Sequence, residues 1–373
     1  MASEPRTVAD HSVDKPDRCG DETPHCMASP TGDPHGGGNG GGCGNTPLVT
    51  IVTPSYNQAQ FLEQTILSVL NQDYPRIEYL IIDGGSTDGS VEIIRRYGDR
   101  LAFWVSEPDR GQSHAINKGF QRANGEILGW LNSDDVYCPG AVRAAVDFLE
   151  LHPDVALTYG AADIIGLDGG VLGPIPVEDF DARVCIARHR YIIPQPAAFF
   201  RREAIERVGL LDERLNYCLD WDYWMRMALA GLKVSRVPQT LARCRYHPDA
   251  KTVRELIGPH EEMITWVDRF FSQPLPPGFA GLERQSRSRA LLNLGRQHFY
   301  GDQYGSAKRA VFRGFLEYPG ILLRDRAFLL LSLSMLPESA VRLVLRLKRS
   351  WFGSPPALEA RIRATGIARA GSR

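Results

Sequence analysis

Residues 48–57 read LVTIVTPSYN, an apolar and β-branched run followed by a proline and polar side chains. This is the pattern of a short buried strand. The same change from apolar to polar recurs at residues 79–88, YLIIDGGSTD, and at residues 126–135, EILGWLNSDD, with a further apolar run at residues 102–105. Stretches with apolar residues at helical spacing, such as residues 112–123, separate these runs. The alternation predicts βαβ units and an α/β fold with a mostly parallel sheet flanked by helices.

The polar clusters that follow these strands predict a binding site. In a parallel sheet, ligands bind beyond the carboxyl ends of the strands, where the chain turns into helices. Residues 53–57, 83–86 and 132–135 all fall at such ends. A single cluster of this kind would mean little, but three of them locate a site.

The second half of the chain predicts a different organisation. We expect shorter strands in a mixed pattern after Val155, and mainly helices after Pro248. Two of the helices are expected to form an antiparallel hairpin. The helices expected in this half are residues 202–208, 219–231, 291–299 and 307–315, the last two forming the hairpin.

The composition of the chain suggests three regions. Residues 1–46 are rich in Gly, Pro, Asp and His, so they bury too little apolar surface to offset the entropy of ordering, and we expect a disordered tail. An α/β domain is expected over residues 47–250. A helical region is expected over residues 251–373.

Charge and cysteine content narrow the function classes. The formal net charge of −1 gives no reason to expect nucleic-acid binding. The seven cysteines are scattered without a CxxC pair, so a zinc ribbon is excluded and a disulfide framework is not expected. We find neither a signal-peptide pattern nor an apolar stretch of the roughly 20 residues that a membrane span needs. We therefore expect a cytoplasmic protein.

The C-terminal helices leave two interpretations open. Residues 327–331 and 341–351 combine apolar and basic residues and end in Trp351. A basic amphipathic helix with a tryptophan is typical of attachment to a membrane surface, here the inner face of the membrane. The alternative is a helix that covers the α/β domain and leaves its arginines solvated.

The cluster Asp134–Asp135 has the chemistry of a phosphate and metal site. A nucleoside diphosphate leaves readily only when its charge is neutralised, and a divalent cation that does so prefers carboxylate oxygens. One carboxylate of the pair would bind the ribose and the other the metal. The alternative, a cap for the helix that starts near Pro139, is disfavoured by the preceding strand and the two partner clusters.

The second acidic cluster supplies a candidate general base. A hydroxyl group that attacks a sugar must lose its proton, and a positioned carboxylate is the usual acceptor. Asp220 is the better candidate, because Asp222 and Arg226 stand at the i,i+4 spacing of an ion pair on a helix. Trp221 lies between Asp220 and Asp222, and Trp224 lies between Asp222 and Arg226. Aromatic residues on a helix either face a sugar ring or pack in the core.

Together these motifs, in this order and spacing, resemble family 2 of the inverting glycosyltransferases, which have the GT-A fold. The resemblance runs from about Leu48 to His247. It implies transfer of a sugar from a nucleoside diphosphate sugar to a hydroxyl acceptor, which is a glycan, a lipid-linked acceptor or a small molecule, with Mn²⁺ or Mg²⁺ as cofactor. A role in cell-surface polysaccharide or glycolipid assembly is expected. The motifs are residues 52–57, 82–89, 117–119, 125–135 and 219–226.

The resemblance also implies roles for individual residues. Asp220 would be the catalytic base, and Asp135 and His247 would bind the metal, although a lone histidine is more often structural. The residues that would bind the nucleotide are Thr53, Pro54, Tyr56, Asp83, Asn117, Lys118 and Asp134. Candidate acceptor contacts are Gln195, Trp221 and Asp222, with Gln195 alternatively bonding a loop backbone.

Two departures from the family pattern qualify these roles. Gly84 stands where many members have a second aspartate near the nucleotide base, and Leu219 stands where a glutamate usually precedes the catalytic base.

Two other functions compete with sugar transfer. A nucleotidyltransferase usually has a Gly-rich basic loop after the first strand, which this chain lacks. In an inactive scaffold with a partner-binding helical tail, there would be no reason for Asp134, Asp135 and Asp220 to occur together.

Overall fold

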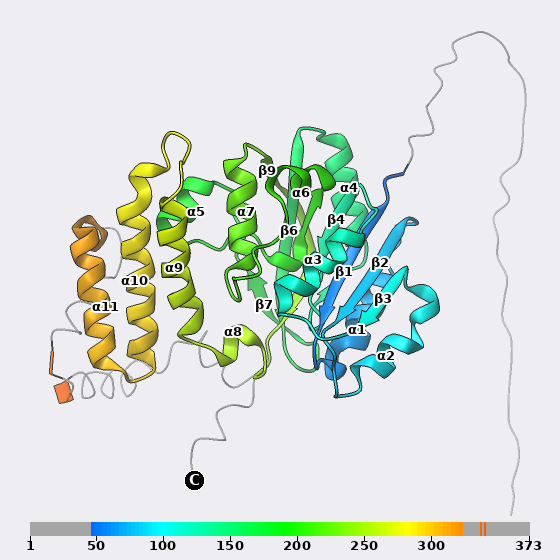
Figure 1. Ribbon diagram of the computed structural model, residues 1–373, viewed down its shortest axis with the longest axis horizontal. Coiled ribbons are helices and arrows are strands. Elements are labelled where there is room, and N and C mark those ends of the chain that lie inside the picture. The colour runs from blue at the N-terminus through cyan, green and yellow to red at the C-terminus, as the bar shows by residue number, and fades with distance from the viewer. Residues whose placement is uncertain (1–45, 324–335, 338, 341–373) are drawn as a thin grey trace, which may run out of the picture. The chain divides into compact units, whose positions relative to one another are not determined.

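The computed structural model describes residues 46–323, 336, 337, 339 and 340 (Figure 1). The expected tail up to residue 45 and the expected amphipathic helices at residues 327–331 and 341–351 lie outside the described residues. Among the helices that are described, none is long and apolar enough to cross a membrane.

The first half of the chain forms a parallel sheet in the order β3-β2-β1-β4. The strands predicted from the apolar runs are confirmed, with shifts of one or two residues at most ends. Each strand ends where the polar cluster begins, so the three clusters meet at one edge of the sheet. The four strands are β1 (Val49–Ser55), β2 (Ile77–Asp83), β3 (Phe103–Ser106) and β4 (Ile127–Trp130).

The second half extends the same sheet with mixed strands, in the order β4-β8-β6-β9-β5, and β7 pairs with β6. The expectation of shorter strands holds for β7 and β8, which are 5 and 4 residues long, but was wrong for β6 and β9, which are 11 and 13 residues long. In β9 exposed residues, including three in a row from Pro238 to Thr240, interrupt the buried ones, which hides a long strand from a search for apolar runs. The strands are β5 (Val136–Tyr137), β6 (Val155–Ile165), β7 (Val171–Ile175), β8 (Ala198–Arg201) and β9 (Lys233–Arg245).

The parallel strands β1, β2 and β4 are mostly buried on both faces, and their alternate residues belong to two separate cores. Val52, Leu80 and Trp130 belong to one core, while Ile51 and Ile81 belong to the other. This is the period of two expected for a strand whose side chains alternate between faces. Helices α3, α7 and α9 cover the first face, and α1, α2 and α4 cover the second. Their bounds are α1 (Ala59–Leu70), α2 (Ser90–Arg96), α3 (Gln112–Arg122), α4 (Ala141–Leu151), α7 (Leu219–Leu229) and α9 (Gly258–Phe271).

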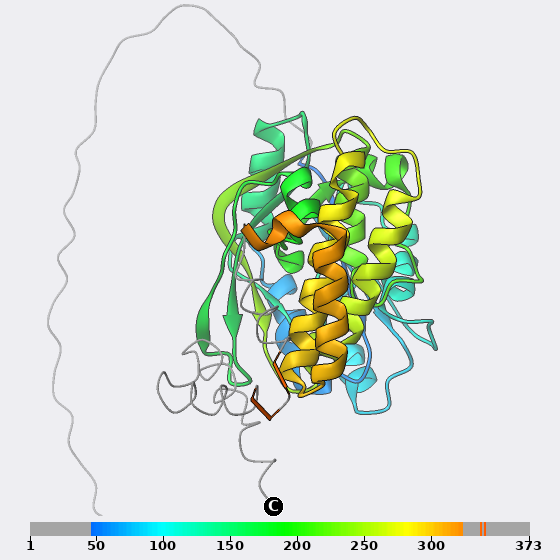
Figure 2. The same cartoon turned by 90° about the vertical axis from the view of Figure 1, so that its left-hand side faces the viewer.

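The helical hairpin predicted near the C-terminus is confirmed: α10 (Glu283–Tyr300) and α11 (Tyr304–Glu317) lie side by side (Figure 2). Helix α9 packs between this hairpin and the sheet domain, and its Met263 and Trp266 belong to the same core as Trp130. The division of the chain at residue 250 stays a prediction. The remaining helices are α5 (Ala182–Arg188), α6 (Arg202–Val208) and α8 (Lys251–Arg254).

Candidate functional site

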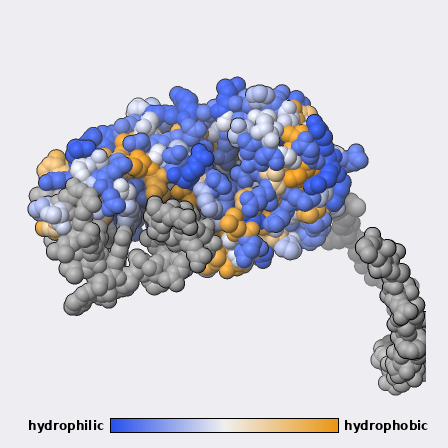
Figure 3. Space-filling model, turned by 90° about the horizontal axis from the view of Figure 1, so that it is seen from below, coloured by the Kyte–Doolittle hydropathy of each residue, from blue (hydrophilic) through white to orange (hydrophobic). Residues whose placement is uncertain are grey.

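A cleft of about 890 Å³ lies at the carboxyl ends of the parallel strands. The turns after β1, β2, β3 and β4 line one side of it, and the start of α7 and residues 249–251 line the other. Figure 3 views the side of the molecule on which α8 lies in Figure 1, where hydrophilic surface alternates with separate apolar patches. Of the residues predicted from sequence, the cleft brings together Pro54, Tyr56, Asp134, Asp135, Gln195 and Asp220.

Asp134 and His247 form a carboxylate–imidazole pair at the cleft. The Oδ2 atom of Asp134 lies 3.1 Å from Nε2 of His247, and the histidine side chain is almost fully buried while that of Asp134 is partly exposed. The imidazole ring packs on Phe61, with 4.6 Å between the ring centroids. The pair is therefore a rigid one, with the carboxylate turned to the cleft.

Asp135 lies deeper than Asp134 and is held by β9. Its Oδ1 atom accepts a hydrogen bond of 2.9 Å from the backbone N–H of Arg245. Burial and the charge of Asp134 raise the pKa of Asp135 well above its usual value. The guanidinium of Arg245 donates to the carbonyl of Asp134 and to that of Gly166. Arg245 thus ties the acidic pair to the end of β9, two residues before His247.

The amide groups of three side chains form a chain across the floor of the cleft. Gln112 Nε2 donates to Asn132 Oδ1 at 2.8 Å, and Asn132 Nδ2 donates to Gln195 Oε1 at 3.0 Å. Gln195 Nε2 donates in turn to the carbonyl of Trp130 at 2.7 Å. The backbone bond left open as an alternative for Gln195 is therefore made, in a position that still lines the cleft.

Asp220 lies at the start of α7, with its carboxylate at the cleft. Its Oδ1 atom accepts the N–H of Trp221 at 2.7 Å. Burial nevertheless raises the pKa of Asp220 to about 6, because removal from water disfavours the charged form. The nearby Tyr191 hydroxyl and Cys218 thiol both have raised pKa values, so they face the carboxylate as neutral groups.

The chain that leads into α7 is held by a side chain from α9. The carboxylate of Glu262 accepts three backbone hydrogen bonds of 2.7 Å each, from the N–H groups of Asn216, Tyr217 and Cys218. Three amides would otherwise need other partners at this helix start. Glu262 therefore fixes the backbone from which Asp220 projects.

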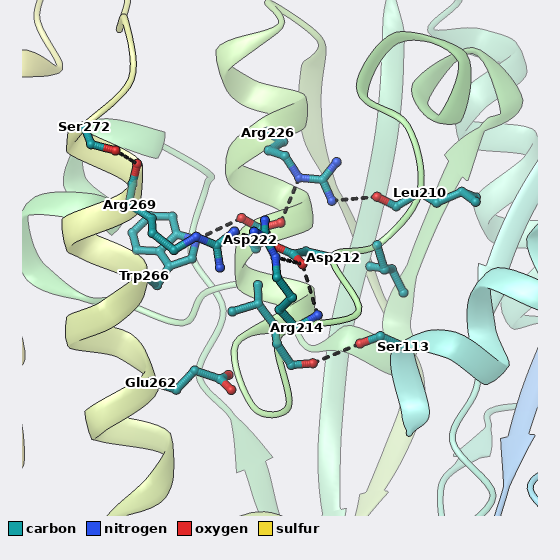
Figure 4. A network of polar contacts seen from close by, with 12 residues as sticks. Ser113, Leu210, Asp212, Arg214, Asp222, Arg226, Glu262, Trp266, Arg269 and Ser272 are labelled. Carbon is teal, nitrogen blue, oxygen red and sulfur yellow. Dashed lines mark hydrogen bonds and ion pairs between the residues drawn. The ribbon is translucent and has the colours of Figure 1, made fainter. Parts of the chain in front are cut away.

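Helix α9 makes two more polar contacts on the same face, at the spacing of neighbouring helical turns (Figure 4). Trp266 Nε1 donates to Asp222 Oδ1 at 2.9 Å, and Arg269 pairs with Asp212. The predicted ion pair between Asp222 and Arg226 is confirmed, with 2.7 Å between Oδ2 and Nε. Asp222 thus joins α7 to α9 and does not line the cleft.

Trp221 and Trp224 are both buried, so the core interpretation of these aromatics is confirmed. The ring of Trp224 stacks on that of Trp130 in β4, with 5.2 Å between centroids. The ring of Trp221 lies between Tyr191 and Trp266, with centroid distances of 4.7 and 5.8 Å. Acceptor contacts through Trp221 and Asp222 stay a prediction.

Four residues predicted to bind the nucleotide lie outside the cleft lining. Thr53 is fully buried and its hydroxyl bonds that of Tyr79 at 3.0 Å. Asn117 exchanges two hydrogen bonds of 3.0 Å with the backbone of Leu211, and Lys118 pairs with Glu107 at 2.7 Å. Their nucleotide contacts stay predictions.

The fourth of these residues, Asp83, shapes the turn that lines the cleft. Its carboxylate is fully buried. It accepts the N–H groups of Gly85 and Ser86 at 3.1 and 2.9 Å and the hydroxyl of Ser106 at 2.7 Å. Asp83 therefore orders the backbone after β2, and a contact with the base or ribose stays a prediction.

Four charged residues of the cleft were not predicted from sequence: Asp109, Arg245, Asp249 and Lys251. Lys251 Nζ donates to the carbonyl of Asn216 at 2.5 Å and lies over the Tyr217 ring. Both Arg245 and Lys251 flank His247 in sequence, so the histidine could have directed attention to them. Asp109 follows β3, and the rule used for the other three strands would have found it. Among the described residues, no group of three or more His, Cys, Asp or Glu side chains could by itself hold a metal ion.

Comparison with known proteins identifies the class. Residues 50–209 match the model of glycosyl transferase family 2. An uncharacterized glycosyltransferase of Mycobacterium tuberculosis strain H37Rv is 34% identical over 189 residues, which cover 50% of this chain and 70% of that protein. An uncharacterized glycosyltransferase of Rickettsia typhi is 29% identical over 231 residues, covering 58% of this chain and 69% of the relative.

Solved structures share the fold at low sequence identity. A mannosyltransferase of Pyrobaculum calidifontis, solved in complex with GDP-Man and Mn²⁺, has a TM-score of 0.51 and 20% identity, with 87% of each chain covered. TarS 1–349 of S. aureus, solved in complex with UDP-GlcNAc, has a TM-score of 0.53 and 16% identity, with 87% of this chain and 92% of that chain covered.

The fold is that of the GT-A glycosyltransferases. The family model and the glycosyltransferase relatives show that the protein is a transferase enzyme. More narrowly, the chain belongs to glycosyltransferase family 2. Membership in this family favours sugar transfer over the two other functions weighed from the sequence.

Proposed function

We propose that the protein is an inverting, metal-dependent glycosyltransferase that moves a sugar from a nucleoside diphosphate sugar to a hydroxyl acceptor. The observation that carries this proposal is the content of one cleft: the Asp134–His247 pair and the half-buried carboxylate of Asp220 line or border the same cavity. The proposal gives the cleft two ends. The donor end is lined by Tyr56, Gly84 and Asp134, and the acceptor end is lined by Asp220 and Tyr217.

The residues at the donor end fit a divalent cation such as Mn²⁺ or Mg²⁺. Asp134 and His247 already bring a carboxylate oxygen and an imidazole nitrogen within 3.1 Å of each other. Two protein ligands suit a cation that takes its other ligands from phosphate oxygens and water. When bound, the cation supplies positive charge that stabilises the departing diphosphate. Asp135, which the family resemblance implies as a ligand, lies behind Asp134 and bonds the Arg245 amide.

At the acceptor end, Asp220 has the properties of a general base. A base works best when its pKa lies near the operating pH, and burial raises the pKa of Asp220 to about 6. In the proposed reaction the acceptor oxygen forms a bond to the anomeric carbon while the bond to the diphosphate breaks. The hydroxyl proton passes to the Asp220 carboxylate. A single displacement of this kind inverts the configuration at the anomeric carbon.

The choice of donor and acceptor follows from the same cleft. The solved neighbours bound GDP-Man and UDP-GlcNAc, which supports a nucleoside diphosphate sugar as donor. At the acceptor end the Lys251 ammonium lies over the Tyr217 ring, and its remaining N–H groups suit a polyhydroxylated acceptor. Assembly of a cell-surface polysaccharide or glycolipid, and contact with the membrane surface, stay predictions.

The test is release of nucleoside diphosphate from a panel of sugar nucleotides, with and without Mn²⁺ or Mg²⁺. We expect release from at least one donor, dependent on the cation and accelerated by a glycan or lipid-linked acceptor. The anomeric configuration of the product, read by NMR, should be inverted. Release that is unaffected by chelation with EDTA would refute metal dependence, and a product of retained configuration would refute the single displacement.

A further inference from the structure

An exposed tyrosine stands on the segment that joins α5 to β8. Tyr191 is 54% exposed, although its neighbours His189, Ile192 and Ile193 are buried. His189 Nε2 lies 2.9 Å from the hydroxyl of Ser286 in α10, and both isoleucines belong to the core that α7 and α9 cover. The exposure of Tyr191 therefore occurs on a segment that is anchored on both sides of it.

The hydroxyl end of Tyr191 is fixed. The hydroxyl lies 3.8 Å from the sulfur of Cys218, whose own thiol donates to the carbonyl of Pro259 at 3.8 Å. A thiol carries one proton, so the sulfur accepts here and the tyrosine hydroxyl donates. Burial of this hydroxyl, together with Cys218 and Asp220, raises the pKa of Tyr191 well above its usual value, so the hydroxyl keeps its proton. The side chain is thus held by its polar end, beside the start of α7.

The ring of Tyr191 packs on α7 at the residue that follows the proposed base. Its centroid lies 4.7 Å from that of the buried Trp221 ring. The backbone N–H of Trp221 donates to Oδ1 of Asp220 at 2.7 Å. Asp220 lines the cleft, whereas Tyr191 does not. Tyr191 therefore stands next to the proposed base and beyond the edge of the cleft.

The segment that carries Tyr191 also reaches into the cleft. Four residues further on, Gln195 lines the cleft and its amide bonds the carbonyl of Trp130. If the donor sugar fills the cleft between Asp134 and Asp220, the part of the acceptor that does not react must extend past Asp220 to the outside. The fixed aromatic ring of Tyr191 lies on that path.

We infer that Tyr191 is an acceptor platform and that the acceptor is a glycoside, whose ring stacks by its C–H face on Tyr191 while one of its hydroxyl groups reaches Asp220. This inference rests on the proposed function. The face of an aromatic ring carries partial negative charge, which attracts the C–H groups on one face of a pyranose. An acyclic polyol offers no such flat face. Tyrosine provides this contact area at low entropic cost, because it has two side-chain torsions and is already held in place.

The test compares Tyr191→Leu with Tyr191→Phe in sugar transfer from the donor that the wild type uses. The acceptors are the methyl glycosides of glucose, galactose, mannose, rhamnose and N-acetylglucosamine, with glycerol and ribitol as acyclic polyols. Leucine keeps apolar contact with Trp221 but has no aromatic face, and phenylalanine keeps the face. We expect at least one glycoside to be an acceptor, with its KM raised about tenfold in Tyr191→Leu and restored in Tyr191→Phe. Glycerol and ribitol should be poor acceptors.

The split between KM and kcat decides whether Tyr191 binds the acceptor. A fall of kcat in Tyr191→Leu with an unchanged acceptor KM would show that the ring only positions Asp220 through Trp221, and would overturn the inference. An equal rise of KM in Tyr191→Phe would assign the effect to the hydroxyl and would also contradict it. Tyr300→Leu, which replaces a 63% exposed tyrosine at the end of α10, is the matched control and should leave the acceptor KM unchanged.

Saturation-transfer NMR of the same glycosides, with UDP or GDP and Mn²⁺ present, separates this inference from the proposed function. Wild-type protein that releases nucleoside diphosphate from a donor but binds none of the glycosides leaves the proposed function intact and contradicts the platform alone. Wild-type protein that binds a glycoside more tightly than Tyr191→Leu does, but releases no nucleoside diphosphate from any donor, contradicts the proposed function. Protein that does neither contradicts both.

Discussion

The two ends of the cleft are built in different ways. At the donor end, Tyr56, Gly84 and Asp134 stand on turns that directly follow β1, β2 and β4, so the sheet itself places them. At the acceptor end, Asp220 starts a helix whose entry is held by Glu262 from α9. The donor end thus depends on local sequence and strand pairing, whereas the acceptor end depends on a helix that follows much later in the chain. Variants at the two ends should therefore affect different steps.

The largest effect is expected for Asp220→Asn. Loss of a general base should lower kcat by roughly 10²–10⁴-fold. Because the donor end lies on other elements, the dissociation constant of the sugar nucleotide should stay as in the wild type. Single-turnover transfer and calorimetry measure the two quantities separately. Asp179→Asn, a surface carboxylate with an 89% exposed side chain, is the control and should leave both unchanged. Retained transfer in Asp220→Asn would exclude it as the base.

The next largest effect is expected at the donor end, for Asp134→Asn and His247→Ala. Removal of one ligand should weaken cation-dependent donor binding by roughly 10–100-fold. A higher Mn²⁺ concentration should partly restore transfer, which it cannot do for Asp220→Asn. Donor titrations at several Mn²⁺ concentrations measure this.

Asp135→Asn is the informative comparison for the variants Asp134→Asn and His247→Ala. Asparagine keeps the oxygen that accepts the Arg245 amide, so the fold should survive. Loss of cation affinity in Asp135→Asn, with Asp134→Asn unaffected, would show that the metal ligand is Asp135, as the family resemblance implies, and would contradict the arrangement proposed from the geometry.

A smaller effect is expected for Glu262→Gln, which tests the long-range support of the acceptor end. The neutral side chain accepts the three backbone N–H groups less strongly, so the free energy of unfolding should fall by about 1–3 kcal/mol. The misplaced carboxylate of Asp220 should lower kcat about tenfold, with donor affinity unchanged. Denaturant unfolding and steady-state kinetics measure both. Glu261→Gln, the exposed neighbour on α9, is the matched control. A loss of donor affinity instead of kcat would mean that α9 supports the whole cleft.

The difference between the donor end and the acceptor end of the cleft also explains which features could be predicted from the sequence. The strands β1 to β4 and the clusters after them follow from apolar runs of period two and from the rule that polar residues gather at strand ends. The cleft residues Pro54, Tyr56 and Asp134 were found in this way, whereas Asp220 was found as the carboxylate of a helical acidic cluster that has no i,i+4 ion-pair partner. The buried roles of Asp83 and Asn117 could not be found, because a polar residue that orders a turn and one that binds a ligand look alike in sequence. Only their hydrogen bonds to Ser86 and Leu211 separate the two cases.

Long-range contacts were the other limit of prediction. The positions of Glu262, Trp266 and Arg269 repeat at helical spacing, which predicts a shared face, but the partners of that face lie in the segment from Asp212 to Asp222. Nothing local to either segment specifies the pairing. The 13-residue strand β9 was missed for a related reason. Its buried residues are interrupted by exposed ones, including three in a row from Pro238 to Thr240, so it lacks the continuous apolar run that marks the buried parallel strands.

The smallest effect expected here is the pH dependence of transfer, which reports on the acceptor end alone. Burial raises the pKa of Asp220 to about 6, and only the deprotonated carboxylate can accept a proton. Activity should therefore rise with pH, reach half its maximum near pH 6, and be about tenfold lower at pH 5 than at pH 7.5. The Tyr191 hydroxyl and Cys218 thiol that face Asp220 have raised pKa values, so they stay neutral in this range. The check is kcat for transfer between pH 5 and pH 8, beside the donor dissociation constant at each pH. If the donor end titrates instead, donor affinity will fall in parallel with the rate at low pH. A constant donor affinity with a falling rate assigns the titration to Asp220.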